Sequence, residues 1–284
     1  MKTKFLAPLL GLLLLAACSP DEEPEAKPAP APQNLCYLQE QTILSGTTNT
    51  TIRYTYNDLN QVIRTEHYEQ EELTEVRTYT YTSDGKLAQE RLLTPDEQEE
   101  ISFTDYSYNP KGRLSKYEVK QRVPELGAVH RIASFKAAYD LQNRLTSATD
   151  YRYQDNKEVA VSSVTQSYPR DKPVVATVKG LGGETLYAAS FVLDSARRTP
   201  LSAVPVFMHR KPGVGYPNMQ NITNFRATTG SGETLALVKD VAYTAAYTYN
   251  NQGYPLTATI TYAGEGGLTD GRTENISYTY NCPD

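Results

Sequence analysis

Few side chains in this chain have the types and spacing that catalysis requires. Hydrolytic enzymes usually place a nucleophile beside a base, or a pair of carboxylates at the scissile bond, and the sequence contains no Gly-x-Ser-x-Gly motif. The three histidines, His67, His130 and His209, lack the spacing of metal ligands. We interpret them as single surface residues, so the sequence predicts no catalytic residue, no metal site and no cofactor.

Two short segments carry weaker chemical signals. Residues 96–100 (DEQEE) offer carboxylates that could bind calcium. They lack the alternating ligands and the glycine of a calcium loop, which favours a solvated hairpin tip. Asp194-Ser195-Ala196 resembles the short O-glycosylation signal of exported Bacteroidota proteins, and this resemblance makes Ser195 a candidate modification site.

An irregular stretch at about residues 205–226 holds the candidates for ligand contact. Prolines and glycines interrupt the strand pattern there, and the basic cluster His209-Arg210-Lys211 lies within it. Insertions on a regular scaffold often carry function, although a structural crossover that caps the sheet is the alternative. The candidate ligand-contact residues are His209, Arg210, Tyr216, Asn221 and Phe225.

Two cysteines, Cys36 and Cys282, lie at opposite ends of the predicted folded region. Outside the cytoplasm two such thiols tend to pair. The sequence therefore favours a Cys36–Cys282 disulfide over two free cysteines.

The third cysteine, Cys18, follows an export signal. Lys2 and Lys4 precede an apolar stretch at residues 5–17, which is shorter than the ~20 residues of a membrane-spanning helix. Leu15-Ala16-Ala17-Cys18 resembles the lipobox of bacterial lipoproteins. This resemblance implies that residues 1–17 are a signal peptide and that Cys18 is acylated, so that its acyl chains hold the protein to a lipid bilayer.

Residues 18–33 are rich in proline, alanine and acids, and we expect a disordered tether there. Asp21-Glu22-Glu23 resembles the surface-export signal of Bacteroidota lipoproteins, with an ordinary solvated linker as the alternative. The predicted location is the outer membrane, on its periplasmic face or at the cell surface. A net charge of −5 provides no basic field for nucleic acid, which is bound mainly through lysine and arginine.

Five copies of a tyrosine-led motif punctuate residues 34–284, which we expect to form one β domain. The copies begin at Tyr56, Tyr81, Tyr108, Tyr139 and Tyr249. Four residues after each tyrosine stands a glycine or an asparagine, the residue types that most readily adopt positive φ. These predicted hairpin-turn positions are Asn60, Gly85, Gly112, Asn143 and Gly253.

Residues before each turn alternate as in half-buried strands. Ile52, Tyr54 and Tyr56 face one side, and the polar residues between them face the other. We expect an inner face of tyrosine and threonine, with the tyrosine hydroxyls reaching water. The predicted fold is all-β, a single antiparallel meander of roughly fourteen to seventeen strands. It is strongly curled or closed into a barrel-like sheet, and the disulfide would fasten its first strand to its last.

The motif copies at residues 108–114 (YNPKGRL) and 139–145 (YDLQNRL) resemble the tyrosine–aspartate (YD) repeat of large secreted shell-forming proteins. With its lipobox, Pro-rich tether and the segment at 221–225, the chain is similar to YD-repeat-like lipoproteins of Bacteroidota, whose domains are of largely unknown function. The resemblance implies a hairpin-repeat fold and an envelope location, and it transfers no catalytic residue.

The sequence thus predicts a membrane-anchored envelope lipoprotein that acts as a non-enzymatic binding or structural module. Its expected partners, besides the bilayer, are a glycan, a lipid or an envelope protein. The alternative is an envelope hydrolase whose paired carboxylates come from different strands.

Overall fold

Seventeen β-strands and the turns between them dominate the part of the chain that the structure describes. The computed structural model describes residues 35–123, 127–142, 144–169, 174–194, 196–203, 221–229, 236–237, 242–264 and 272–283. The strands are β1 (Tyr37–Ser45), β2 (Thr48–Tyr56), β3 (Val62–Glu69), β4 (Glu72–Tyr81), β5 (Leu87–Leu93), β6 (Glu100–Tyr108), β7 (Leu114–Val123), β8 (Ala128–Tyr139), β9 (Leu145–Gln154), β10 (Lys157–Ser167), β11 (Val174–Lys179), β12 (Thr185–Leu193), β13 (Ile222–Thr229), β14 (Ala236–Leu237), β15 (Tyr243–Tyr249), β16 (Pro255–Tyr262) and β17 (Thr273–Asn281).

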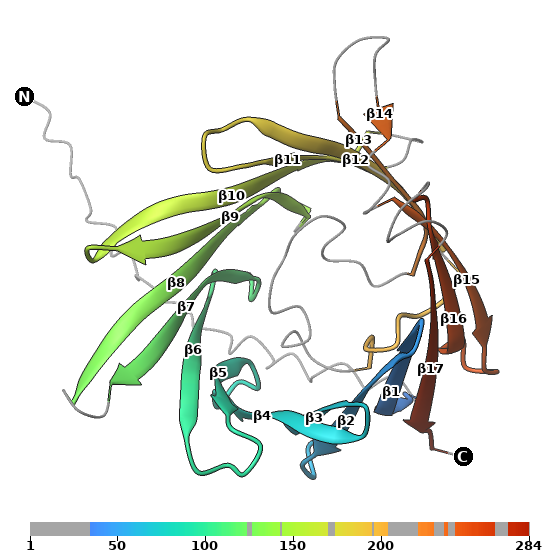
Figure 1. Cartoon of the computed structure of the whole chain (residues 1–284), viewed down its shortest axis with the longest axis horizontal. Helices are drawn as coiled ribbons and strands as arrows, with labels where there is room; N and C mark the ends of the chain where they lie inside the picture. Colours follow the sequence, from blue (N-terminus) through green and yellow to red (C-terminus); the bar gives the residue numbers. More distant parts are fainter. Residues whose placement is uncertain are drawn as a thin grey trace, which may run out of the picture. The chain divides into compact units, whose positions relative to one another are not determined.

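The strands form one sheet that closes on itself (Figure 1). Apart from β14, each strand pairs antiparallel with the next along the chain, and β17 pairs antiparallel with β1 from Tyr37↔Asn281 to Ser45↔Glu274. The short β14 lies beside β13, which also pairs with β15, so the ring runs through all the other strands. The prediction of an all-β meander closed into a barrel is confirmed.

The expected irregular stretch at 205–226 ends earlier than predicted, because β13 begins at Ile222. Phe225 and Ala227 lie opposite Phe191 and Ala189 of β12, and burial of these apolar pairs extends the sheet into the stretch. Several predicted residues lie outside the described part of the chain. They are Cys18, Asn143, Ser195, His209, Arg210 and Tyr216, together with the signal peptide and the tether.

The tyrosine-led motifs are hairpin turns at one end of the barrel, which we call the motif end. The backbone φ is +57° at Asn60, +79° at Gly85, +76° at Gly112 and +83° at Gly253. These values lie in the left-handed region, which glycine and asparagine adopt at the lowest cost.

The residue directly after each motif tyrosine stabilises the turn. Oδ1 of Asn57 accepts hydrogen bonds from the backbone N–H groups of Leu59 (3.0 Å) and Gln61 (2.9 Å). This is an Asx turn, in which a short side chain replaces a backbone acceptor. The same pair of bonds recurs at Asn109, Asp140 and Asn250.

Six tyrosine hydroxyls form a girdle at the motif end. Each donates a hydrogen bond of 2.7–3.0 Å to a backbone carbonyl at the start of the preceding strand. Tyr108, for example, ends β6 and bonds the carbonyl of Leu87, which begins β5. The girdle consists of Tyr56, Tyr81, Tyr108, Tyr139, Tyr168 and Tyr280. These hydroxyls, which were expected to reach water, bond the backbone instead. At Tyr56, Tyr81, Tyr108 and Tyr139 a bulge directly precedes the tyrosine.

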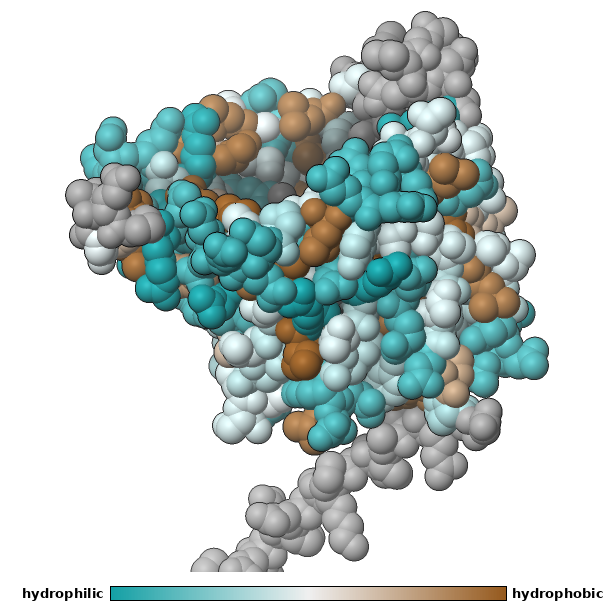
Figure 2. Space-filling model, turned by 60° about the horizontal axis from the view of Figure 1, so that its bottom comes forward, coloured by the Kyte–Doolittle hydropathy of each residue, from teal (hydrophilic) through white to brown (hydrophobic). Residues whose placement is uncertain are grey.

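The inner face of the barrel is apolar toward the motif end. One buried cluster joins β8 to β13 and contains Phe135, Leu145, Ala148, Val164, Ala176, Ala189, Phe191, Phe225 and Ala227. A second cluster joins β1 to β5 and contains Leu38, Tyr54, Val62, Tyr79 and Leu87. Threonine, which was expected on this face, is mainly on the outer one. Figure 2 shows an outer surface on which hydrophilic residues predominate and hydrophobic ones are scattered.

Removal of one girdle hydroxyl should destabilise the barrel. In Tyr108→Phe the ring stays, but the carbonyl of Leu87 loses its donor in a half-buried site. We expect a loss of about 1–2 kcal/mol in the free energy of unfolding, the cost of one unsatisfied polar group, measured by urea denaturation. Tyr151→Phe, on the outer face of β9, is the matched control and should change little. Equal losses of stability in the two variants would contradict a stabilising role of the girdle hydroxyl.

Alkaline pH should also destabilise the barrel. Burial raises the pKa of Tyr56, Tyr81, Tyr108, Tyr168 and Tyr280 above the ordinary 10.0. Because the folded-state pKa exceeds the unfolded one, the stabilisation is complete below about pH 10 and is lost as pH rises above it. The urea midpoint should stay level up to about pH 9 and fall beyond pH 10, less steeply in Tyr108→Phe. A midpoint that stays level above pH 10 would refute this.

Candidate functional site

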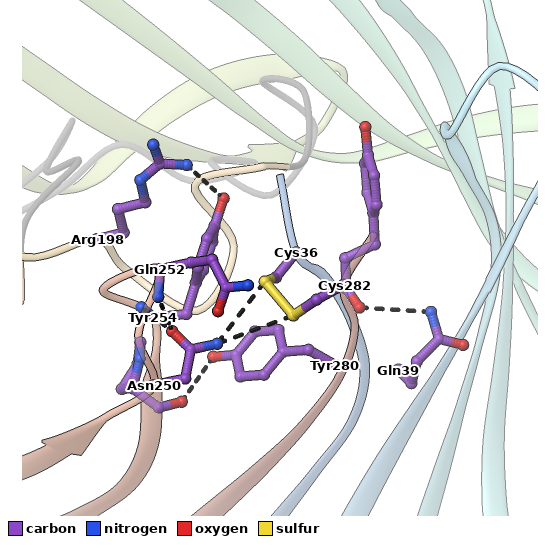
Figure 3. The surroundings of a disulfide bond; sticks show 10 residues. Cys36, Gln39, Arg198, Asn250, Gln252, Tyr254, Tyr280 and Cys282 are labelled. Carbon is purple, nitrogen blue, oxygen red and sulfur yellow. Dashed lines mark hydrogen bonds between the residues drawn. A yellow bond between two sulfur atoms is a disulfide. The ribbon is translucent and has the colours of Figure 1, made fainter. Parts of the chain in front are cut away.

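The two ends of the chain's β domain are covalently joined at the motif end (Figure 3). Cys36 and Cys282 form a disulfide with a Cα–Cα distance of 4.1 Å across 246 residues of sequence. Cys36 is fully buried, directly before β1, and Cys282 directly follows β17. The predicted bond is confirmed, and it lies at the seam where the first and last strands pair.

A motif turn also contacts this disulfide. Nδ2 of Asn250 lies 3.7 Å from Sγ of Cys36 and 3.8 Å from Sγ of Cys282. Its Oδ1 meanwhile holds the β15–β16 turn as described above. The fifth copy of the motif therefore links its own turn to the seam.

Residues 196–203, which lie between β12 and β13 in the sequence, pack against the motif end. Nη1 of Arg198 donates to the hydroxyl of the fully buried Tyr254 (2.8 Å), and the Arg198 backbone N–H donates to the carbonyl of Gly253 (3.0 Å). Leu201 packs against the apolar cluster of β1 to β5. These contacts make 196–203 part of the framework that holds this end of the barrel.

Asn221, a predicted ligand-contact residue, is engaged by the same framework. It is 5% exposed, and its Nδ2 donates to the carbonyl of Arg198 (2.7 Å) and to the hydroxyl of Tyr249 (3.3 Å). The Tyr249 hydroxyl in turn donates to Asp194 (2.8 Å), and this bond and burial raise the pKa of Tyr249 to about 12. Asn221 therefore orders the backbone rather than facing a ligand.

A group of titratable side chains, which we call the inner ion cluster, lies on the inner face of β3 to β5. It consists of His67, Glu75, Arg77 and Glu90. The Arg77 guanidinium donates to both Glu75 and Glu90, and His67 Nε2 lies 3.7 Å from Oε1 of Glu75. Glu90 is 4% exposed and also accepts a hydrogen bond from Tyr106 of β6 (2.9 Å).

The inner ion cluster brings cross-strand carboxylates together, as the hydrolase alternative required. Both carboxylates, however, accept hydrogen bonds from one guanidinium, which uses their lone pairs within the protein. Such pairing suits a buried structural network better than a general acid and base. His67, expected to be a single surface residue, is an inner-face member of this network, whereas His130 is exposed.

Three of the four carboxylates at 96–100 are paired within the protein. Asp96 accepts a hydrogen bond from the hydroxyl of Thr94 (2.6 Å), and Glu97 pairs with Arg64 (2.7 Å). Glu100 pairs with Arg91 (2.5 Å) and Arg122 (2.9 Å). Among the residues described, no group of three or more His, Cys, Asp or Glu side chains is placed to hold a metal ion.

The fifth predicted contact residue, Phe225, lines a pocket in the barrel wall. β13 and β15 share only two register pairs, Asn224↔Thr244 and Phe225↔Tyr243. A pocket of about 250 Å³ lies at this short junction, and we call it the wall pocket. Its lining residues are Asn224, Phe225 and Arg226 of β13, Ala242, Tyr243 and Thr244 at β15, and Thr261, Tyr262 and Ala263 at β16.

Aromatic rings from three successive strands stand at the wall pocket. Phe225 and Tyr243 are stacked, with centroids 5.4 Å apart and planes inclined by 7°, and Tyr262 is tilted against Tyr243 at 5.9 Å. Burial raises the pKa of Tyr243, so its hydroxyl stays protonated at neutral pH. The rings give the pocket a rigid apolar wall.

Polar side chains line the outward side of the wall pocket, across the sheet from these rings. Asn224, Arg226 and Thr244 are exposed, and Arg226 forms no ion pair with any residue that the structure describes. The guanidinium of Arg272 stacks on Tyr262, 4.2 Å from the ring centroid, and pairs with Glu274 at 3.3 Å. A flat apolar wall beside a guanidinium suits a ligand that has both an apolar face and a negative group.

Sequence reasoning found Phe225 but missed its partners Tyr243, Tyr262 and Arg226. The motif signal marks turns, whereas the pocket arises where β13 pairs with β15, at the end of β15 away from the motif turn. The inner ion cluster did carry a signal. The alternation that places Tyr79 and Tyr81 on the inner face of β4 also places Arg77 and Glu75 there.

Comparison with known proteins shows the fold. A family model described as "Uncharacterised protein" matches residues 33–132, and no curated protein matches the chain. A porin-like protein from Bacteroides uniformis ATCC 8492 is 14% identical, with 86% of this chain and 96% of that chain covered and a TM-score of 0.54. A porin-like protein from Bacteroides vulgatus ATCC 8482 is 13% identical, with 87% and 99% covered and a TM-score of 0.51.

Because the sequence identities are low, the similarity to these structures concerns the fold alone. It supports the β-rich repeat fold that the resemblance to YD-repeat-like proteins implied. The lipidation of Cys18 stays a prediction. In the described parts of the chain, the structure has no helix with the length and apolar character to cross a membrane.

Loss of the seam disulfide should destabilise the closed barrel. In the double variant Cys36→Ser/Cys282→Ser the unfolded chain regains the freedom that the long covalent loop removes. We expect a loss of about 2–5 kcal/mol in the free energy of unfolding, measured by urea denaturation of the oxidised proteins. Reduced wild type should match the variant. A variant as stable as the oxidised wild type would show that the bond contributes nothing.

Proposed function

We propose that this protein is an envelope lipoprotein, held to the outer membrane through an acylated Cys18, whose barrel is a non-enzymatic binding module for an acidic carbohydrate. The observation that carries the proposal is the wall pocket, whose lining combines Arg226 from the outer side of the sheet with the rings of Phe225, Tyr243 and Tyr262 from its inner side. A sugar ring has an apolar face of C–H groups that packs on aromatic rings. A uronate adds a carboxylate that a guanidinium binds with two parallel hydrogen bonds.

The charged side chains on the outer wall of the barrel are typical of a surface in contact with water rather than lipid. At outward positions of β6 to β8 stand ion pairs such as Lys120–Asp105 (2.7 Å) and Lys116–Glu118 (2.9 Å). Strands that face a bilayer carry an apolar outer band instead. The similar structures are described as porin-like, and we infer that this chain shares their fold while its own attachment to the membrane is the lipid of Cys18.

The hydrogen bonds of the inner carboxylates favour a binding function over hydrolysis. Glu75 and Glu90 both accept hydrogen bonds from Arg77, so their oxygens are engaged inside the protein rather than free to act on a glycosidic bond. The wall pocket offers recognition groups, namely a guanidinium, an amide and hydroxyls around aromatic rings.

The proposal predicts that Arg226→Gln weakens binding of an acidic oligosaccharide. The probe is oligogalacturonate, titrated calorimetrically into the unit Asn34–Asp284. We expect loss of about tenfold in affinity or more, because a hydrogen-bonded charge pair contributes ~1.5–3 kcal/mol. Binding by wild type should weaken as salt rises.

The matched control is Lys179→Gln, which removes a charge from the outer face of β11, away from the wall pocket. It should leave affinity unchanged. Unaltered urea midpoints for both variants would separate binding from folding. If wild type fails to bind oligogalacturonate, or if both variants weaken binding equally, the assignment of an acidic carbohydrate to this pocket fails.

A further inference from the structure

The outer wall of the barrel is divided into a charged part and an uncharged part. On β5 to β8 the outward side chains form ion pairs across strands, including Arg122–Glu100 at 2.9 Å and Lys120–Asp105 at 2.7 Å. On β15, β16 and β17, all three described in full, no outward side chain is charged. Threonine, serine, asparagine and alanine take their place, together with Leu256 at the start of β16, which is 42% exposed.

Strand register aligns these small polar side chains in a row across the seam. Antiparallel pairing puts Thr248 opposite Thr257, Thr257 opposite Ser277, Ser277 opposite Thr42, and Thr42 opposite Thr51. The hydroxyls of Thr248 and Thr257 lie 2.7 Å apart, and those of Thr42 and Thr51 lie 3.3 Å apart. With strands about 4.8 Å apart, the five members span about 19 Å.

A second row runs beside the first. It aligns Ala246 with Thr259, Asn275, Leu44 and Asn49. The hydroxyl of Thr259 donates to Oδ1 of Asn275 at 3.2 Å. We call the two rows together the hydroxyl face. A groove of about 470 Å³ lies along its centre, between members of both rows from β1, β2, β16 and β17.

We propose that the hydroxyl face binds an extended, uncharged glycan chain. Hydroxyl and amide groups both donate and accept hydrogen bonds, which matches the hydroxyls of a neutral sugar wherever they point. The charges that adjoin the first row, Arg53 and Glu40, pair with each other at 2.9 Å. A charged polymer would therefore leave water, at a desolvation cost, without gaining an unpaired counter-charge here. The length of the rows and of the groove suits a chain of several sugar units rather than a single one.

The same composition disfavours a protein as the occupant. Protein interfaces are anchored by large side chains such as tyrosine, tryptophan and arginine, while serine and threonine rarely contribute much energy. The only large apolar side chain that lines the groove from an outward position is Leu44, 44% exposed. The hydroxyl face thus offers many directional polar contacts and little hydrophobic anchoring.

The test is calorimetric titration of the full chain with three neutral hexasaccharides, from β-1,4-linked glucan, mannan and xylan, and with hexagalacturonate. We expect at least one neutral hexasaccharide to bind with an affinity that does not depend on salt. Thr257→Val/Thr259→Val, which keeps side-chain shape and removes two hydroxyls, should weaken that binding about fivefold or more, since each net hydrogen bond contributes ~0.5–1.5 kcal/mol.

Two controls separate this site from others. Thr165→Val, on the outer face of β10, removes a hydroxyl from another part of the wall and should have no effect. Arg226→Gln should leave neutral-glycan binding unchanged. The proposal for the wall pocket and the proposal for the hydroxyl face can therefore fail independently of each other.

Three results would overturn the proposal. One is that no neutral hexasaccharide binds, and another is that Thr257→Val/Thr259→Val binds as wild type does. The third is self-association in sedimentation experiments that Thr259→Arg abolishes, because a second copy of the chain would then be the occupant.

Discussion

The pairing of β1 with β17 is the constraint on which the rest of this structure depends. An antiparallel meander leaves unpaired N–H and C=O groups along its first and last strands, and such edges are open to aggregation. Here the two edges satisfy each other from Tyr37↔Asn281 to Ser45↔Glu274, and the Cys36–Cys282 bond fixes the junction. Closure defines an inside and an outside. It also joins residues near both chain ends into the hydroxyl face, which exists only across the seam.

The repeated motif supplies the local geometry for closure, and four of its positions have separate physical tasks. The tyrosine hydroxyl bonds a strand-end carbonyl, as in Tyr81 with Val62 (2.7 Å). The next residue forms the Asx turn, the glycine or asparagine takes the positive φ, and the residue at the start of the next strand is commonly buried in the core. Loss of any of the first three leaves a polar group unsatisfied or a backbone strained, and loss of the fourth leaves a cavity.

Several features could be predicted because they depend on local sequence. Turn positions follow from the left-handed preference of Gly85, Gly112 and Gly253, and strand direction follows from alternation. The disulfide followed from compartment and cysteine count. The partners of Phe225 could not be predicted, since the short β13–β15 junction reflects register between distant strands. The place of His67 in the inner ion cluster was missed for the same reason, because its neighbour Glu75 lies opposite it on the next strand.

The sequence by itself determined the turns, the alternation of the strands and the all-β class, because these properties depend on backbone preferences within a few residues. Only the tertiary structure decided which face is inner, where the wall pocket opens and which hydroxyls align across the seam. A shift in register of one residue would exchange the two faces of a strand. Ring closure fixes that register through contacts between residues as far apart as Thr42 and Ser277.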